Sequence, residues 1–215
     1  MSESDIYFKQ LELGPMQNFI YLIGDPVTRE AAVIDPGWEV PTILATAQQD
    51  GYRLTKAFVT HHHFDHVMGL SELLHAVDIP VYVNQHDAPL VEISSSARKP
   101  LRGGDEVTIG TLPVRLLHTP GHTPGSQCLL VRDRLLSGDT LFIGSCGRCD
   151  LPGGSPTQLY ESLSQRLRQL DDQTVLCPGH HYAPEVTVLL GREKQHNPFL
   201  AATTLQRFLR LVGAA

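Results

Sequence analysis

The chain has 215 residues, of which 41% are hydrophobic and 19% charged, which is ordinary for a globular domain. The formal net charge of −6 gives no basic footprint, so no nucleic-acid partner is expected. No apolar run approaches the roughly 20 residues of a membrane span, and the opening Met1–Asp5 is acidic, unlike a signal peptide. We therefore expect a cytoplasmic protein that does not enter a membrane. Because no linker or internal repeat is visible, we expect one domain over residues 1–215.

The first half of the chain alternates short strands with helices. Gly24-Asp25-Pro26 separates two apolar runs and predicts a hairpin. Helical spacing of apolar residues marks the intervening helices. The expected elements are strands at 19–23 and 31–34, a helix at 41–50, a strand at 56–60, a helix from His66 to Val77 and a strand at 80–83.

The second half is richer in strands. Ser155-Pro156 predicts a helix start, with serine as the N-cap and proline in the first turn. The expected elements are a surface loop at 92–104, strands at 107–109, 114–117, 127–131 and 134–136, an irregular stretch at 143–155, a helix from 156 through Leu170, a strand at 175–177 and a helix from about 198 to 212. Short strands with helices on both flanks favour an α/β fold with sheets in the middle and helices outside.

The segment Thr60–His66 places four imidazoles and one carboxylate in seven residues. Crowded histidines are costly unless their nitrogen lone pairs are shared, and transition metals share them. In an extended segment His61, His63 and Asp65 point to one side. His66 lies off that line and is free to face a second metal ion, whereas His62 is expected to point away.

Three later loops repeat one pattern, in which an apolar strand ends in a glycine-rich turn that carries a histidine or aspartate. A fold that gathers strand ends at one edge would bring all these loops together. Seven protein ligands are too many for one tetrahedral ion, and they suit two ions with one carboxylate bridging. The candidate ligands are His61, His63, Asp65, His66, His122, Asp139 and His180.

The motifs THHHFDH, TPGHTPGS, SGDTLF and CPGHHY follow one another between residues 60 and 182. In this order they resemble the metallo-β-lactamase superfamily. The resemblance implies an αβ/βα sandwich, with two mixed β-sheets face to face and helices on both outer faces. It also implies how the ligands divide: metal 1 held by His61, His63 and His122, metal 2 by Asp65, His66 and His180, and both by Asp139. Two divalent ions are expected, zinc first, with iron or manganese as alternatives.

A pair of divalent ions roughly 3.5–4 Å apart lowers the pKa of bound water and supplies hydroxide at neutral pH. It can also polarise a carbonyl and stabilise the resulting oxyanion. Asp65 could orient that hydroxide or accept its proton, and Asp139 would bridge the ions, so these two are the candidate catalytic residues. No serine or cysteine nucleophile is then needed.

Residues 138–154 resemble glyoxalase II-like hydrolases, which cleave glutathione thioesters, and residues 191–200 resemble the ending of short bacterial members. The first segment also resembles persulfide dioxygenases, which use one iron to oxidise glutathione persulfide. Full-length glyoxalase II has a further helical region that helps to hold glutathione, and only about thirty-five residues follow His180 here. The expected partner is therefore a small thioester, with a glutathione conjugate as one form and a lactone as another option. A metal-binding domain without catalysis is the third hypothesis.

Two further residues are candidates for substrate binding. Arg148 could hold a substrate carboxylate, or be a solvated loop arginine. Tyr182 could donate a hydrogen bond beside the metals, or pack. Asp35 could orient a ligand histidine, or cap a turn. Cys146-x-x-Cys149 lacks the partners of a zinc knuckle, and without a secretory signal no disulfide framework is expected.

Overall fold

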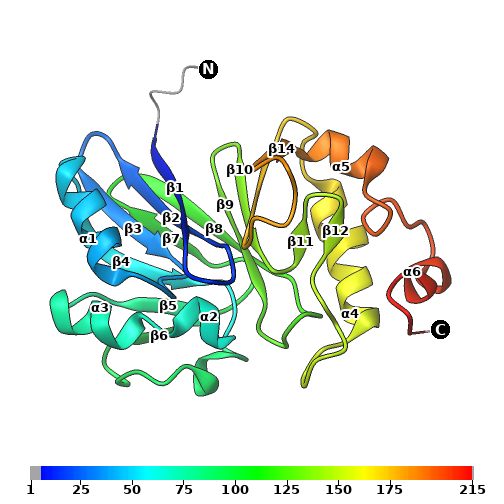
Figure 1. Ribbon diagram of the computed structural model, residues 1–215, viewed down its shortest axis with the longest axis horizontal. Helices are drawn as coiled ribbons and strands as arrows, with labels where there is room; N and C mark the ends of the chain where they lie inside the picture. Colours follow the sequence, from blue (N-terminus) through cyan, green and yellow to red (C-terminus); the bar gives the residue numbers. More distant parts are fainter. Residues whose placement is uncertain (1–5, 215) are drawn as a thin grey trace.

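Two β-sheets packed face to face, with helices on both outer sides, make up the computed structural model, which describes residues 6–214 (Figure 1). Sheet 1 has the strand order β1-β2-β3-β4-β5-β6, and sheet 2 has the order β14-β13-β10-β9-β8-β7. Both sheets mix parallel and antiparallel pairs. The expected sandwich is therefore confirmed.

Sheet 1 is antiparallel from β1 to β3 and parallel from β3 to β6. Its helices lie on the outer face at the left of Figure 1. Its elements are β1 (Tyr7–Leu13), β2 (Asn18–Asp25), β3 (Glu30–Ile34), α1 (Val40–Gln49), β4 (Arg53–Val59), α2 (Phe64–Val67), α3 (Leu70–Ala76), β5 (Val81–Asn84), η2 (Ala88–Leu90) and β6 (Arg98–Leu101).

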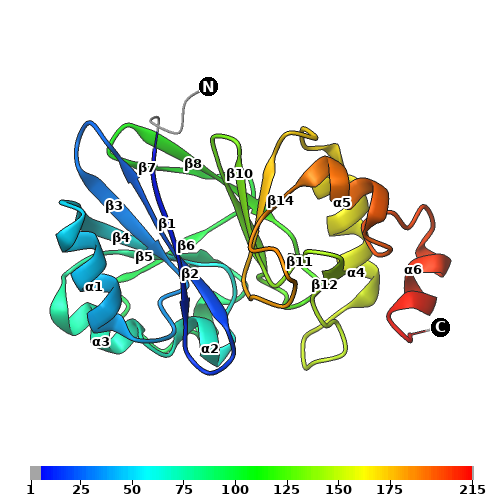
Figure 2. The same ribbon diagram turned by 45° about the horizontal axis from the view of Figure 1, so that its top comes forward.

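Sheet 2 is covered by the helices at the right of Figure 1, and the turned view in Figure 2 shows the same layers. A two-stranded ribbon, β11 with β12, stands beside it. The elements of this half are β7 (Glu106–Ile109), β8 (Leu112–His118), β9 (Gln127–Val131), β10 (Arg134–Gly138), β11 (Leu141–Phe142), β12 (Ser145–Cys146), α4 (Pro156–Glu161), η3 (Ser162–Arg166), η4 (Leu167–Gln169), β13 (Val175–Pro178), β14 (Val188–Leu189), α5 (Leu190–His196) and α6 (Leu205–Leu211).

Strand β2 shows how the layers are held together, because all eight of its residues are buried. Successive side chains of a strand point to opposite faces. Ile20 and Leu22 therefore pack in the core beneath α1 and α3, whereas Tyr21 and Ile23 pack in the core between the sheets. Strands covered on both faces become continuously apolar, which is why this segment is easy to find in the sequence.

Several elements differ from the expectations. The stretch 92–104 is not only a loop, since it contains β6, whose Arg98-Lys99-Pro100 sequence suits an exposed sheet edge. The helix expected from His66 is split into α2 and α3 near Gly69. A Cβ at Gly69 would lie 2.4 Å from the carbonyl oxygen of Pro36, so the chain needs glycine there.

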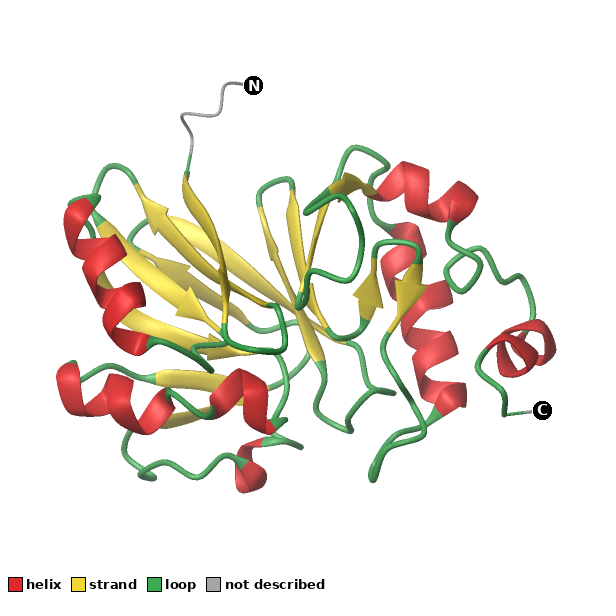
Figure 3. Ribbon diagram, in the orientation of Figure 1, coloured by secondary structure: helices red, strands yellow, loops and turns green. Residues whose placement is uncertain are grey.

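The last helix begins at Leu205 rather than near 198, and Thr204 caps it by accepting a hydrogen bond from the backbone N–H of Arg207. Strands β1 and β14 and helix α5 were not expected. The helix start at 155–156 is confirmed, since the Ser155 side chain accepts from the N–H of Gln158. Figure 3 shows the resulting division into sheets, flanking helices and long connecting loops. None of the helices within residues 6–214 is long and apolar enough to cross a membrane.

Candidate metal centre

The predicted ligand loops emerge from the ends of strands in both sheets. The histidine run follows β4, the His122 loop joins β8 to β9, Asp139 follows β10, and His180 follows β13. Strands β10 and β13 are parallel neighbours, so their carboxyl ends lie together. An antiparallel bridge between Asn18 and His180 then attaches the last of these loops to sheet 1.

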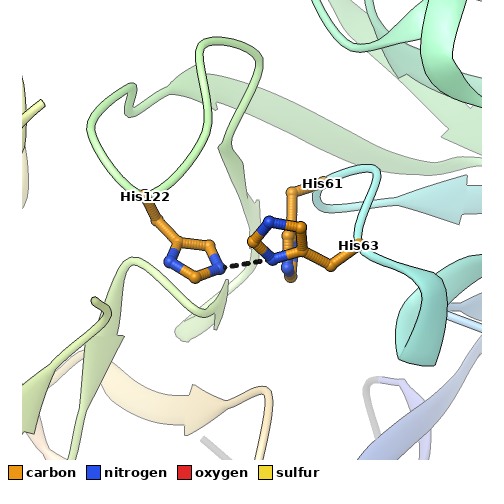
Figure 4. A group of neighbouring side chains, drawn as sticks. All are labelled: His61, His63 and His122. Carbon is orange, nitrogen blue, oxygen red and sulfur yellow. Dashed lines mark hydrogen bonds between the residues drawn. The ribbon is translucent and has the colours of Figure 1, made fainter. Parts of the chain in front are cut away.

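The structure brings all seven candidate ligands together. Three overlapping groups each have their ligand atoms within 4.8 Å of one another. Figure 4 shows the first group, in which the rings converge from two separate loops. The groups are His61 with His63 and His122, His61 with His66 and Asp139, and Asp65 with His66 and His180.

Hydrogen bonds on the far side of three rings set their tautomers. His66 donates from Nδ1 to Asp35 Oδ2 at 2.9 Å. His122 donates from Nδ1 to the carbonyl oxygen of Arg148 at 2.7 Å, and His180 to that of Met16 at 2.9 Å. Since these acceptors hold the Nδ1 hydrogens, Nε2 is the nitrogen of each ring that faces the centre and that could bind a metal ion once it carries no proton.

His61 is oriented by a short relay. Thr60 donates its hydroxyl hydrogen to Asp35 Oδ2 at 2.6 Å, and its oxygen lies 3.1 Å from His61 Nδ1, from which it accepts. His61 Nε2 is then buried without a hydrogen-bond partner in the described part of the chain, and so is Oδ1 of Asp139. Buried polar atoms are normally satisfied, and a metal ion would satisfy both.

The spacing of the donors fits a metal ion. Donors bound at 2.0–2.1 Å to a tetrahedral ion lie roughly 3.3–3.4 Å apart. His180 Nε2 lies 3.3 Å from Asp65 Oδ2 and 3.4 Å from Asp139 Oδ2. His66 Nε2 lies 3.3 Å from Asp65 Oδ2 and 3.4 Å from Asp139 Oδ1. Imidazole and carboxylate donors suit zinc, iron and manganese.

Asp139 lies between the groups. Its Oδ2 is 3.7 Å from His122 Nε2, and its Oδ1 is 3.4 Å from His66 Nε2. Burial alone would raise the pKa of Asp139, but the neighbouring histidines, His66 foremost, hold it below its ordinary value. The carboxylate is therefore ionised and within reach of both halves of the centre.

The imidazoles fall into two electrostatic classes. Burial, followed by the nearby imidazoles, lowers the pKa of His61 and brings that of His63 to about 4, so both rings are neutral at pH 7. Burial would also lower the pKa of His180, but hydrogen bonds with Asp139 and Asp65 outweigh it and raise the pKa to about 9. The His180 ring therefore carries a second proton at pH 7, and a metal ion would replace that proton.

Two buried polar residues that sequence reasoning missed support the centre. Asn18 donates from Nδ2 to Asp65 Oδ2 at 2.8 Å, and its own Oδ1 accepts from Trp38 Nε1 at 2.9 Å. Burial would raise the pKa of Asp65, but hydrogen bonds from His180, His66 and Asn18 hold it far below the ordinary value. Asp65 therefore stays ionised and fixed in orientation.

Asp87 is the second of these residues and is completely buried. It accepts hydrogen bonds from the backbone N–H and Nδ1 of His62 at 3.0 and 2.9 Å. It also accepts from the Thr123 hydroxyl at 2.7 Å and the Gly125 N–H at 2.6 Å. One carboxylate thus joins the His61–His63 loop to the His122 loop, and the His62 ring bonds to it instead of joining the three ligand groups.

The candidate substrate-binding residues occupy distinct places. Arg148 forms a bidentate pair with Asp150, at 3.0 and 2.8 Å, and only its carbonyl oxygen contacts the centre. The ring of Tyr182 stacks on that of His180, with centroids 4.7 Å apart, and 57% of the residue is exposed.

Two other expectations can now be compared with the structure. Of the alternatives for Asp35, the structure shows the hydrogen bond to a candidate ligand histidine, here His66. The four cysteines are free thiols, and burial, followed by the charge of Cys149, raises the pKa of Cys146 to about 12.

Comparison with known proteins gives consistent results. The model of the metallo-beta-lactamase superfamily matches residues 13–180. The probable metallo-hydrolase YqgX of Bacillus subtilis (strain 168) is 35% identical, over 92% of this chain and 99% of its own. A hydroxyacylglutathione hydrolase of Alkalilimnicola ehrlichii is 42% identical over 77% of this chain, and the match spans only 62% of that relative.

The crystal structure of ETHE1 from Myxococcus xanthus superposes with a TM-score of 0.87, at 35% identity, covering 96% of this chain and 90% of its own. The family match covers most of the chain, and its final residue is the ligand candidate His180. The chain therefore belongs to the metallo-beta-lactamase superfamily.

Proposed function

We propose that the protein is a metal-dependent hydrolase that cleaves a thioester. The observation that carries the proposal is the convergence of imidazole rings on two ionised carboxylates, with nitrogen–oxygen distances suited to metal ligation. The proposed ligands are His61, His63 and His122 for one ion and Asp65, His66 and His180 for the other, with Asp139 shared between them.

Two divalent ions held there would supply hydroxide at neutral pH and polarise the acyl carbonyl. Asp65 is the proposed proton acceptor because it is ionised and Asn18 fixes its orientation. Burial, followed by the charges of Asp139 and Asp65, raises the pKa of Tyr182. Tyr182 therefore keeps its hydrogen at neutral pH and can donate it to a substrate oxygen at the exposed side of the centre.

The thioester class is supported by the hydroxyacylglutathione hydrolases among the relatives. Because the chain matches only 62% of their length, glutathione as the thiol is a separate proposal. The proposed binding role of Arg148 requires its guanidinium to leave Asp150. A lactone is the alternative substrate for the same hydrolytic centre.

The test begins with elemental analysis of protein purified without added metal or chelator. About two ions per chain are expected, and the loaded protein should hydrolyse S-lactoylglutathione or a simpler acyl thioester, measured by thiol release. Replacing Asp65 with Ala should abolish turnover while circular dichroism shows an intact fold. Unchanged turnover of D65A would remove the proposed mechanism.

The second candidate is a persulfide dioxygenase with a single iron. The observation that favours it is the position of the Cys146–Asp150 segment against the centre: a Cβ on Gly147 would lie 3.3 Å from His122 Nδ1. Iron-loaded protein should then consume oxygen when glutathione persulfide is added. About one iron per chain with persulfide-dependent oxygen uptake would replace the hydrolase proposal, and absence of uptake would exclude the dioxygenase.

A further inference from the structure

Exposed apolar side chains gather in one hollow beside the metal centre. Among the described residues nine large apolar side chains are exposed, and three of them line this hollow: Phe64 at 59%, Met68 at 59% and Leu90 at 55%. Its volume is about 350 Å³. Scattered exposed apolar residues are ordinary, whereas several that line one concavity make that concavity a candidate binding site.

The hollow, which we call the apolar cleft, is lined by buried core residues and by polar residues as well as by the exposed apolar side chains. Leu70 and Val91 form the floor, each 1% exposed and part of the core beneath sheet 1. Ser71 and the exposed Glu92 also line it. Phe64, Met68 and Leu90 supply exposed apolar surface and Glu92 supplies a negative charge, so the cleft suits an apolar group and disfavours an anion.

The cleft lies beside the loop that carries the first candidate ligands, because His62 and Phe64 line it and flank His63 in the chain. Phe64 lies between His63 and Asp65 in the chain, and consecutive Cα atoms are about 3.8 Å apart. The inward positions of α2 are the buried Asp65 and His66, so Phe64 faces outward. Its ring meets that of Trp38 edge-on, with centroids 6.4 Å apart.

We propose that the apolar cleft binds the hydrocarbon acyl chain of the substrate, so that the enzyme prefers thioesters of unbranched apolar acids. This rests on the proposed thioester hydrolysis and adds a substrate class to it. The occupant is a small chain rather than a protein partner, because a stable protein interface needs roughly 800 Å² from each side. Glu92 repels a chain that ends in a carboxylate.

The expected size of the preference follows from apolar burial. Each methylene group that leaves water is worth about a fourfold gain in kcat/KM until the cleft is full. The thioesters to compare are those of N-acetylcysteamine, a small neutral thiol, with acetyl, butyryl, hexanoyl and octanoyl groups. The adipoyl thioester has the length of the hexanoyl compound with a carboxylate in place of the terminal methyl group, and it should react about tenfold more slowly or worse.

Substitutions in the cleft test whether its side chains cause the dependence of kcat/KM on acyl chain length. Leu90→Ala and Met68→Ala should flatten the rise of kcat/KM with chain length. Glu92→Gln should speed the adipoyl compound alone. Val27→Ala is the matched control, because Val27 is 84% exposed on the turn between β2 and β3, outside the lining of the cleft.

Binding can be followed without turnover, because Trp38 is the single tryptophan of the chain. Hexanoate, which carries no thioester to hydrolyse, should change its fluorescence in the metal-loaded protein, and in the Leu90→Ala variant the change should need a higher concentration. If no thioester is hydrolysed but hexanoate binds in this way, the hydrolase proposal fails and the cleft stands as an apolar site. If thioesters are hydrolysed with no dependence on chain length, or if L90A keeps the full dependence, the cleft proposal is overturned and the hydrolase proposal stands.

Discussion

The Nε2 atoms of His66 and His180 lie 3.2 Å apart, although 114 positions separate the two residues in the chain. Each ring donates its other nitrogen's hydrogen to a fixed acceptor, Asp35 for one and the Met16 carbonyl for the other. The pKa of His180 is raised to about 9, so a proton separates the two nitrogens at neutral pH. A metal ion that replaced this proton would bind both rings and so join two distant loops.

Removal of metal should destabilise the protein for this reason. At a free metal concentration of a hundred times Kd, binding adds about 2.7 kcal/mol to the free energy of unfolding, or roughly 5–10 °C in Tm for a chain of this size. Differential scanning calorimetry before and after dialysis against a chelator measures the shift, and added zinc should reverse it. An unchanged Tm in protein shown to be metal-free would contradict this.

Replacing Asp35 with Asn should weaken metal binding by about 10- to 100-fold. The Asp35 carboxylate accepts from His66 Nδ1, the Thr60 hydroxyl and the Thr60 N–H. An amide offers one acceptor oxygen, so part of this set is lost and a ring is no longer held in the right tautomer. Competition with a chromophoric chelator measures the affinity. Asp133→Asn, at a half-exposed residue paired with Arg134, is the control and should bind metal as the unaltered protein does.

Replacing Asp87 with Ala should lower the free energy of unfolding by about 3–5 kcal/mol, because buried donors from two loops lose their charged partner. Urea denaturation of the metal-free protein measures this without any contribution from metal binding. Asp105→Ala removes a carboxylate that accepts from the N–H of Arg102 at an exposed turn, and it should cost far less. Equal losses in the two variants would show that Asp87 does not act by joining the loops.

Asp25 should control the stability of the protein in acid. Its carboxylate accepts from the N–H groups of Thr111 and Val27, and these bonds lower its pKa to about 2. An unfolded aspartate has a pKa of about 3.9, so the contribution of Asp25 is complete above about pH 4 and is lost as the pH falls to about 2. The urea midpoint of the Asp25→Asn variant should therefore fall less steeply between pH 5 and pH 2.5 than that of the unaltered protein. Parallel declines of the two midpoints would exclude this role for Asp25.

The sequence identifies the candidate ligands, which the structure brings together, because they lie in short motifs with strong local signals. The histidine run can be recognised within seven residues, and the buried strand β2 can be recognised by its continuous apolar character. Strand β6 could not be found this way, because its Arg98-Lys99-Pro100 stretch is polar and becomes a strand only by pairing with β5. Its formation depends on a partner seventeen residues away, as the register of Val81 with Arg98 shows.

The supporting residues escape prediction for a related reason. Asn18 and Asp87 belong to no motif, and their roles arise from contacts with Asp65 and with the His122 loop, which the fold brings near. The carbonyl groups of Met16 and Arg148 leave no signal at all, since every residue carries one. Candidate ligands that lie in local motifs can therefore be predicted from the sequence, whereas the hydrogen bonds that orient their side chains are found only in the structure.

The division of the metal centre between the two sheets has one more consequence. Sheet 1 ends at Leu101 and sheet 2 begins at Glu106, so a peptide bond cut at Gly103–Gly104 would give two pieces that each carry one six-stranded sheet. The first piece would keep His61, His63, Asp65 and His66, and the second His122, Asp139 and His180. Neither piece carries all seven candidate ligands, and the two pieces share the apolar core between the sheets. If the proposed ions bind, added metal should tighten the pairing of the two pieces, so a split protein of this kind would report on available metal.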